Sequence, residues 1–239
     1  MDTAGYVTLS RQSGLWSEMQ MVANNVANIS TAGYRSEGLI FAEYVRALEA
    51  EGGSVALTDA HARVTLEAQG ALTQTGGTYD LAIEGPGYFQ VDTPAGVRLT
   101  RAGSFTPNAD GTLMTPLGHA LLDAGGAPVV VPPGAGSVRI AGDGTLSVDG
   151  QPLALIGRVA PPEGTAPGRE DGVLFDPRGP VEPVDEGNIV QGFLERSNVN
   201  PVAEIARMIE VSRAYEASQR LLDRDDERIK QVLDTIGRV

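Results

Sequence analysis

Hydrophobic residues recur at helical spacing over the last 40 residues of the chain. From Pro201 onward the stripe advances in steps of three and four, which is the period of an amphipathic helix. Asn200 suits the N-cap, and proline suits the first helical position because its missing N–H has no partner there. Polar residues interrupt the stripe, so it is thin. Its apolar members are Ile205, Ile209, Leu222, Ile229, Leu233 and Ile236, and its polar members are Ser212, Glu216, Gln219 and Asp226.

A second helical stripe lies near the N-terminus, where Leu9, Trp16, Met19, Ala23 and Val26 share one face. Polar residues and a glycine over 28–33 are expected to end this helix. The C-terminal helix would be about 54 Å long at 1.5 Å per residue, and so long a helix with a thin apolar stripe is not stable alone. We therefore expect the two terminal helices to pair into a coiled-coil-like stalk.

The middle of the chain is rich in glycine and proline and predicts short antiparallel strands. Turns are expected at 85–87, 108–111 and 149–150. A spacing of roughly eight to twelve residues between strands is typical of an antiparallel sandwich or irregular barrel, which gives an α+β protein overall. The expected strands are 79–84, 88–92, 97–101, 113–114, 120–122, 129–131, 138–140, 145–148 and 153–159.

These patterns divide the chain into four segments. Residues 1–34 form the N-terminal helix, and residues 193–239 contain the C-terminal helix. Residues 71–192 form the β-rich domain, in which 161–187 is expected to be loop-rich. Residues 35–70 are expected to be an extended linker with some helical pattern over 41–48.

Charge separates the β-rich middle from the helical ends. The formal net charge is −13, and about −12 of it lies on residues 36–199. An acidic chain repels phosphate backbones and anionic lipids, so neither nucleic acid nor a membrane surface is expected as a partner. No apolar run is long enough to span a bilayer, and the first ten residues lack the features of a Sec signal peptide.

The residues available for catalysis are few. The chain has no cysteine and two histidines, His61 and His119, and no serine lies in a Gly-x-Ser-x-Gly elbow. The acidic run at 223–227 spreads around a helix and is read as a solvated face. We therefore expect no catalytic residue, no metal site and no cofactor.

Three groups of motifs resemble those of the bacterial flagellar rod and hook protein family. VANNVAN (22–28) followed by TAGYR (31–35) is similar to its N-terminal signature, and LERSNVN (194–200) with RAYE (213–216) to its C-terminal one. YDLAIEG (79–85), GYF (87–89) and TRAGSF (100–105) resemble its core β motifs. The length and the start at 6–12 are most similar to a rod member; a distal rod or hook-type member stays open.

The resemblance implies a structural subunit that performs no reaction. It would polymerise helically with other copies of itself and with other rod proteins in the periplasm, after export through the flagellar type III apparatus. The terminal helices would form the inner tube, packing within and between subunits. The residues expected at that interface are Leu9, Trp16, Met19, Ala23, Asn24, Asn25, Val26, Asn28, Ile205, Ile209, Arg213, Tyr215, Leu222, Ile229 and Leu233.

Two other classes of protein stay open from the residues alone. One is a secreted β-rich hydrolase or cell-wall-binding domain, although aromatic residues, which would form sugar platforms, make up only 5% of the chain. The other is a chaperone or adhesin that uses coiled-coil ends. Neither class accounts for the signatures at both ends of the chain.

Overall fold

The computed structural model describes residues 3–47 and 54–236 and divides the chain into two compact units. The helical unit takes its residues from 1–27, 36–66 and 200–239. The β unit takes them from 28–35 and 67–199. The chain therefore passes between the units four times, and each unit is described separately below.

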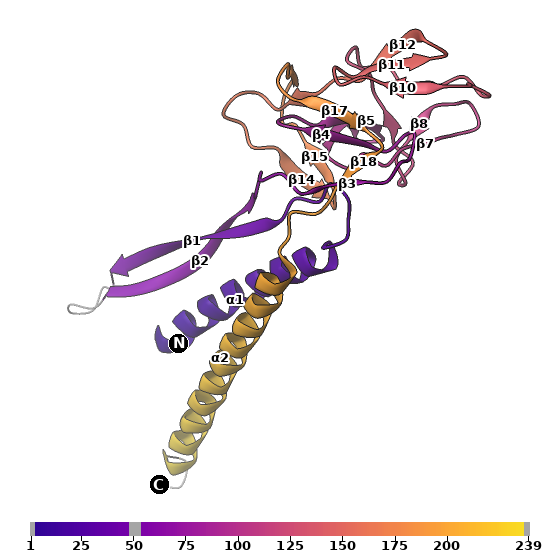
Figure 1. Ribbon diagram of the computed structural model, residues 1–239. Coiled ribbons are helices and arrows are strands. Elements are labelled where there is room, and N and C mark those ends of the chain that lie inside the picture. The colour runs from indigo at the N-terminus through magenta and orange to yellow at the C-terminus, as the bar shows by residue number, and fades with distance from the viewer. Residues whose placement is uncertain (1–2, 48–53, 237–239) are drawn as a thin grey trace. The chain divides into compact units, whose positions relative to one another are not determined.

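Two antiparallel helices form the body of the helical unit (Figure 1). They are α1 (Thr3–Ala27) and α2 (Pro201–Ile236). The predicted start of α2 is confirmed: the Asn200 side-chain oxygen accepts the N–H groups of Val202 and Ala203 at 3.1 and 3.2 Å. The described helices include none that is long and apolar enough to cross a membrane.

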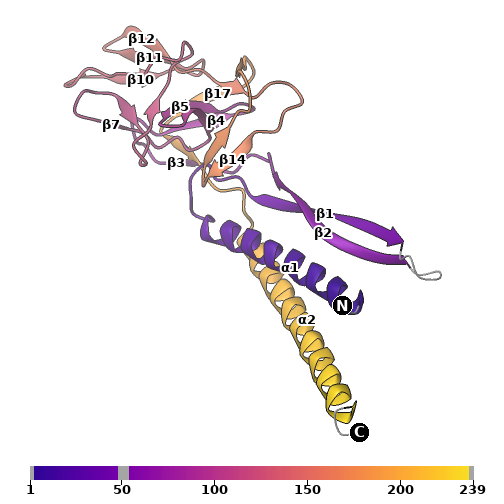
Figure 2. The ribbon, with the colours of Figure 1, turned by 180° about the vertical axis from the view of Figure 1, so that it is seen from behind.

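A long two-stranded ribbon completes the helical unit (Figures 1 and 2). It consists of β1 (Glu37–Ala47) and β2 (Ser54–Thr65), which pair antiparallel with a register shift between Ile40 and Phe41. The helical pattern expected over 41–48 is wrong for 41–47, which is strand; residue 48 lies outside the described residues. Continuous pairing with β2 provides hydrogen bonds that override a weak local periodicity.

Short antiparallel strands build the β unit. The largest sheet has seven strands in the order β14-β15-β6-β5-β9-β8-β7. A three-stranded sheet has the order β10-β11-β12, and smaller sheets pair β17 with β4, β18 with β3, and β13 with β16. The strands are β3 (Leu72–Gln74), β4 (Leu81–Glu84), β5 (Phe89–Thr93), β6 (Gly96–Thr100), β7 (Thr106–Pro107), β8 (Leu113–Met114), β9 (Ala120–Leu121), β10 (Val138–Ile140), β11 (Thr145–Val148), β12 (Gln151–Leu155), β13 (Val159–Ala160), β14 (Gly168–Asp171), β15 (Leu174–Asp176), β16 (Glu182–Pro183), β17 (Asn188–Gln191) and β18 (Phe193–Glu195).

A contiguous apolar core fills the β unit. Phe89 and Phe105 meet edge to face with ring centroids 5.7 Å apart, a favourable aromatic geometry. Buried side chains from β4, β5, β8, β9, β11 and β17 surround them. The α+β class with antiparallel strands is confirmed.

Two parts of the β unit differ from the expected strands. The segment 161–187 is loop-rich as expected, and within it β14 and β15 extend the seven-stranded sheet through β6. Residues 129–131 form no regular strand, although Val129 and Val131 are buried. Val129 accepts the N–H of Leu113 and donates to the Leu121 carbonyl, and Val131 donates to the Gly111 carbonyl. The expected strand 153–159 is divided between β12 and β13.

Candidate assembly interface

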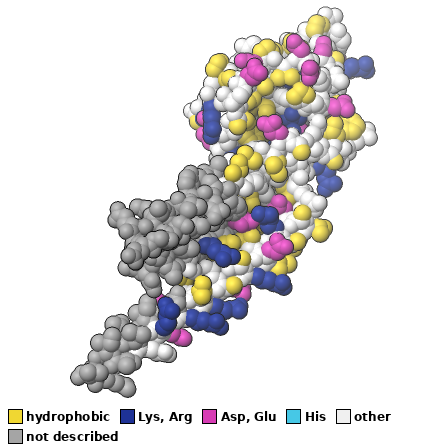
Figure 3. Space-filling view, turned by 90° about the vertical axis from the view of Figure 1, so that its left-hand side faces the viewer, with side chains coloured by type: hydrophobic (Ala, Val, Ile, Leu, Met, Phe, Trp, Pro, Cys, Tyr) yellow, Lys and Arg dark blue, Asp and Glu magenta, His cyan; other side chains and the backbone are white. Residues whose placement is uncertain are grey.

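Large apolar side chains of the terminal helices face solvent. On α1, Leu9 and Trp16 are each about half exposed, and Ala23 continues the same row at a spacing of seven residues. On α2, Val202 is 78% exposed, and Ile205 and Ile209 are about half exposed. Figure 3 shows hydrophobic side chains among Lys and Arg on one face of the molecule. Exposed apolar rows of this kind are typical of surfaces that bind other proteins.

A different face of α2 packs within the chain. Tyr215 meets Trp16 with ring centroids 6.1 Å apart. The Arg207 guanidinium donates to the Glu18 carboxylate at 2.7 Å from its Nε. Among the described side chains of α2, those buried or partly buried are Glu204, Met208, Val211, Ser212, Ala214, Tyr215, Ser218 and Leu222.

The residues predicted at the interface fall into three groups. Those exposed are Leu9, Trp16, Ala23, Asn24, Ile205, Ile209 and Arg213. Those partly or fully covered within the chain are Met19, Asn25, Val26, Asn28, Tyr215 and Leu222. Ile229 and Leu233 belong to α2, but their side chains lie outside the described residues. The structure brings Trp16 and Tyr215 together and leaves Ile205 and Ile209 on another face.

Asn25 is a buried connector between α1 and the start of β1. Its amide nitrogen donates to the carbonyl of Glu37, and its amide oxygen accepts the N–H of Glu37, both at 2.9 Å. The same nitrogen lies 3.3 Å from a carboxylate oxygen of Glu204 on α2. A buried side-chain amide satisfied in this way fixes the end of α1 against two other elements.

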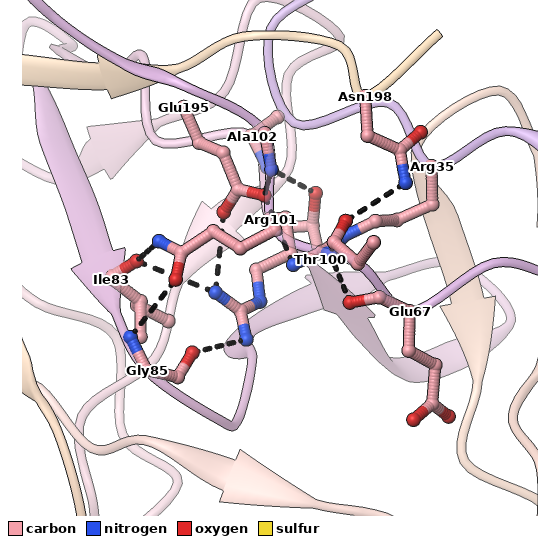
Figure 4. Close-up of polar contacts among 12 residues, drawn as sticks. Arg35, Glu67, Ile83, Gly85, Thr100, Arg101, Ala102, Glu195 and Asn198 are labelled. Carbon is pink, nitrogen blue, oxygen red and sulfur yellow. Dashed lines mark hydrogen bonds and ion pairs between the residues drawn. The ribbon is translucent and has the colours of Figure 1, made fainter.

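A buried ionic cluster in the β unit joins three of the motifs noted in the sequence (Figure 4). The Glu195 carboxylate contacts Arg35 Nη2 at 2.9 Å and Arg101 Nη1 at 3.2 Å. These three side chains are 1%, 2% and 5% exposed. We call Arg35, Arg101 and Glu195 the junction. Because charges are expensive to bury, such a cluster is stable only when its members are paired and hydrogen-bonded.

Backbone carbonyls satisfy most of the remaining donors of the junction. Arg101 donates to the carbonyl of Gly85 at 2.7 Å, and Arg35 donates to the carbonyls of Glu67 and Ala68. In Figure 4 the Glu67 carboxylate points away from both guanidinium groups, so Glu195 supplies the counter-charge. The Nε atoms of Arg35 and Arg101 have no hydrogen-bond partner.

Aromatic rings and glycines hold the motifs of the junction in place. The guanidinium of Arg169 lies 4.6 Å from the Tyr34 ring centroid and 4.9 Å from that of Phe175, and such cation–π contacts are attractive. Gly33 has a φ of +71°, and a Cβ there would lie 2.2 Å from the backbone nitrogen of Ala102. A residue with a side chain therefore does not fit at this position.

Sequence reasoning identified the motifs but not the junction. Arg35, Arg101 and Glu195 each appear in a motif, yet no role follows for them from local spacing. The partners in the two ion pairs are 94 and 160 positions apart in sequence, so only the folded chain shows the contact. The signal that could have pointed to these residues is a charge beside apolar and glycine-rich strand ends, because a charged residue in such a setting is buried only when it is paired.

Tyr88 borders the junction, and the fold changes the pKa of its phenol. Its ring lies 5.3 Å from the Arg101 guanidinium carbon and 5.6 Å from the Phe175 ring. Burial raises the pKa of the Tyr88 phenol above its ordinary value of about 10, while the nearby Arg35 lowers it in part. The fold therefore favours the neutral phenol.

We predict that Tyr88 weakens the fold in alkali. Above the ordinary phenol pKa the unfolded chain ionises first, so stability present below pH about 10 falls as the pH rises toward the raised pKa. Tyr88→Phe keeps both ring contacts and removes the titration. Urea unfolding between about pH 8 and about pH 11 should show a smaller loss of stability for the variant; equal losses would contradict the assignment.

The described residues contain no group of three or more His, Asp or Glu side chains placed to hold a metal ion. An open cavity of about 500 Å³ beside the junction is lined by Arg35, Arg101, Tyr88 and the loops 85–87 and 160–165. Its two arginines already bond Glu195 and backbone carbonyls.

Three family patterns match along the chain. The family described as "Flagella basal body rod protein" matches residues 6–35, and "Flagellar hook protein FlgE/F/G D1 domain" matches residues 82–148. "Flagellar basal body rod FlgEFG protein C-terminal" matches residues 190–235. The matched ranges include both apolar rows and all three residues of the junction.

Relatives match over the full length. The flagellar basal-body rod protein FlgF of Caulobacter vibrioides is 36% identical over 248 residues, covering 100% of both chains. FlgF of Mesorhizobium japonicum is 36% identical over 242 residues, covering 99% of both. The flagellar basal-body rod protein FlgG of Bacillus subtilis is 27% identical, covering 96% of this chain and 97% of that protein. The resemblance noted in the sequence is thereby confirmed, and the chain belongs to the flagellar basal-body rod protein family.

Proposed function

We propose that this structural rod subunit polymerises through the two apolar rows of its terminal helices. The row on α1 is Leu9, Trp16 and Ala23, and the row on α2 is Val202, Ile205 and Ile209. The observation that carries the proposal is the exposure of large aliphatic and aromatic side chains on helices whose other faces are already packed. Burial of such rows between subunits releases roughly 25 cal/mol per Å² of apolar surface.

The terminal helices would form the inner part of the rod and continue into a coiled-coil-like stalk between copies. Every described side chain of α2 from Asp223 to Asp234 is exposed, so this end of the helix offers surface to neighbouring subunits. The four-segment division, with helical ends at 1–34 and 193–239 and a β-rich domain at 71–192, would then separate an inner tube from an acidic outer face. Such a face stays soluble while the rod turns.

The subunit would assemble into the rod after it has been exported as an unfolded chain. The chain has no cysteine, so no disulfide opposes unfolding and threading through the flagellar type III export apparatus. Helical ends with thin apolar stripes would complete their packing on the growing rod in the periplasm, where interface burial offsets the entropy lost on ordering. Neighbours would be other copies of this chain and other rod proteins.

The row on α2 is tested by Ile205→Gln with Ile209→Gln. Glutamine retains helix propensity and removes the apolar surface, so the purified variant should keep its far-UV circular dichroism. Cells that rely on it should not swim, and their basal bodies should lack a complete rod. Ala203→Gln with Glu210→Gln is the matched control, since both positions are exposed on other parts of α2. Complete rods containing the first variant would refute the proposal.

A further inference from the structure

The four connections between the two units begin, on the side of the β unit, at residues 28, 35, 67 and 199, and the last three lie within four positions of a residue bonded in the junction. They fall at 27–28, 35–36, 66–67 and 199–200. Arg35 is the last residue of the β unit before the chain crosses to the helical unit, and Glu67 is the first residue after the chain returns. Glu195 precedes the fourth connection by four residues. The junction therefore lies where the chain enters and leaves this unit.

Hydrogen bonds link these entering and leaving segments directly to one another. The N–H of Gly33 donates to the Glu195 carbonyl at 2.8 Å, and the N–H of Gly70 donates to its carboxylate at 3.0 Å. The Asn198 side chain donates to the Ala68 carbonyl at 2.8 Å, and its N–H donates to the Tyr34 carbonyl at 3.3 Å. Residues far apart in sequence are thus bonded in one small region.

Glu195 bonds to the largest number of these segments. Its backbone holds the segment of Gly33, and its carboxylate holds Arg35, the segment of Gly70, and Arg101. Arg101 in turn donates to the carbonyls of Ile83 on β4 and of Gly85. The same carboxylate therefore ties the connections to each other and to a core strand.

We propose that Glu195 is a positioning residue that fastens the four connections together, so that force passing between the two units is shared among them. The proposal rests on the rod function above, since only a load-bearing subunit needs such sharing. A segment held by one hydrogen bond opens alone under load, whereas segments bonded to one charged group must open together. The price of this coupling is two buried guanidinium groups that depend on one carboxylate.

An ordinary buried ion pair would behave differently from a fastening residue. Losing an ordinary pair lowers the stability of the whole unit, so all its amides exchange faster in parallel. Losing a fastening residue opens the connections locally, below the energy of global unfolding. Hydrogen exchange on the full chain separates the two cases because four relevant amides are themselves hydrogen-bond donors: Gly33, Gly70, Arg196 and Asn198.

The first test variant is Glu195→Gln, which keeps the shape and loses the charge. We expect exchange at those four amides to rise at least about tenfold, with amides of β5 and β6 changing much less. Glu170→Gln is the matched control, since Glu170 pairs with Arg98 at the surface of the same unit. A parallel rise throughout the unit, or no rise at the four amides, would overturn the proposal.

A second variant keeps the test valid if Glu195→Gln folds poorly. Asn198→Ala removes the bond to the Ala68 carbonyl without leaving a buried charge. Exchange should rise several-fold at Gly70 and at residue 198 while the urea midpoint stays near that of the wild type. Unchanged exchange at both amides would contradict the fastening role.

Swimming under load separates this inference from the rod function. Cells carrying Asn198→Ala should build rods and swim in dilute medium, but should slow more than wild-type cells as viscosity rises. Local loosening in vitro combined with complete absence of the wild-type chain from rods would refute the rod function and leave the fastening of the connections intact. Normal rods with no local loosening would refute the fastening alone.

Discussion

Replacing Glu195 with alanine, which unlike glutamine removes both side-chain oxygens and every hydrogen bond that they accept, is expected to lower the free energy of unfolding of the whole β unit by about 3–5 kcal/mol, because two guanidinium groups would remain buried without any partner in its place. The N–H of Gly70 would also lose its acceptor. Urea titration of the full chain, followed by circular dichroism, measures the loss. Among the described ion pairs, those at the surface should lose much less stability when one partner is removed, because water solvates the charge that remains.

Glu170→Ala is the control for that experiment. Its ion pair with Arg98 is partly exposed, with Glu170 42% accessible, so its loss should change the free energy of unfolding far less than the loss of Glu195. A Glu195→Ala effect as small as the control would mean that water or rearranged backbone replaces the carboxylate, and would remove the physical basis for the junction.

The second large effect is expected from Gly103→Ala. A Cβ at this position would lie 1.6 Å from the carbonyl oxygen of Leu81 and 2.7 Å from its carbonyl carbon. Both obstacles are backbone atoms, and Leu81 also donates its N–H to the Gly103 carbonyl at 2.9 Å. The segment around Gly103, which lies between β6 and β7, must therefore move away from β4, at an expected cost of about 3 kcal/mol or more. Thermal or urea unfolding of the variant gives the value.

Gly142→Ala provides the matched comparison in the same unit. There a Cβ would meet the Asn188 side chain at 3.4 Å, an ordinary contact. The substitution also reduces the freedom of the unfolded chain, so a change between slight loss and a gain of about 1 kcal/mol is expected. Similar destabilisation by both substitutions would show that the loss of glycine's flexibility, rather than the close approach of the Leu81 backbone, causes the effect of Gly103→Ala.

Local sequence was sufficient for the helices because their signals are local. The Asn200 cap and Pro201 define where α2 begins, and the glycine at position 33 follows the end of α1 at the expected distance. The stripe through Ile205 and Ile209 predicted a helix correctly. It did not indicate that Met208, Val211 and Tyr215 would form the face packed within the chain, since that depends on which surfaces α1 presents.

Strand partners were harder to predict because pairing is decided by distant segments. β14 and β15 lie in a stretch of glycine, proline and charge that locally predicts loop, and they become strands because β6 offers an open edge. The ribbon of β1 and β2 likewise arises from pairing along its whole length.

By itself, the sequence determined the two terminal helices, the antiparallel β-rich middle and the family, because caps, periodicity and motif order are all carried by neighbouring residues. Only the tertiary structure decided which apolar rows remain exposed and that Arg35, Arg101 and Glu195 meet. The reason is physical: burying a charge is tolerable only beside its partner, and partners 94 and 160 positions apart become neighbours only when the chain has folded.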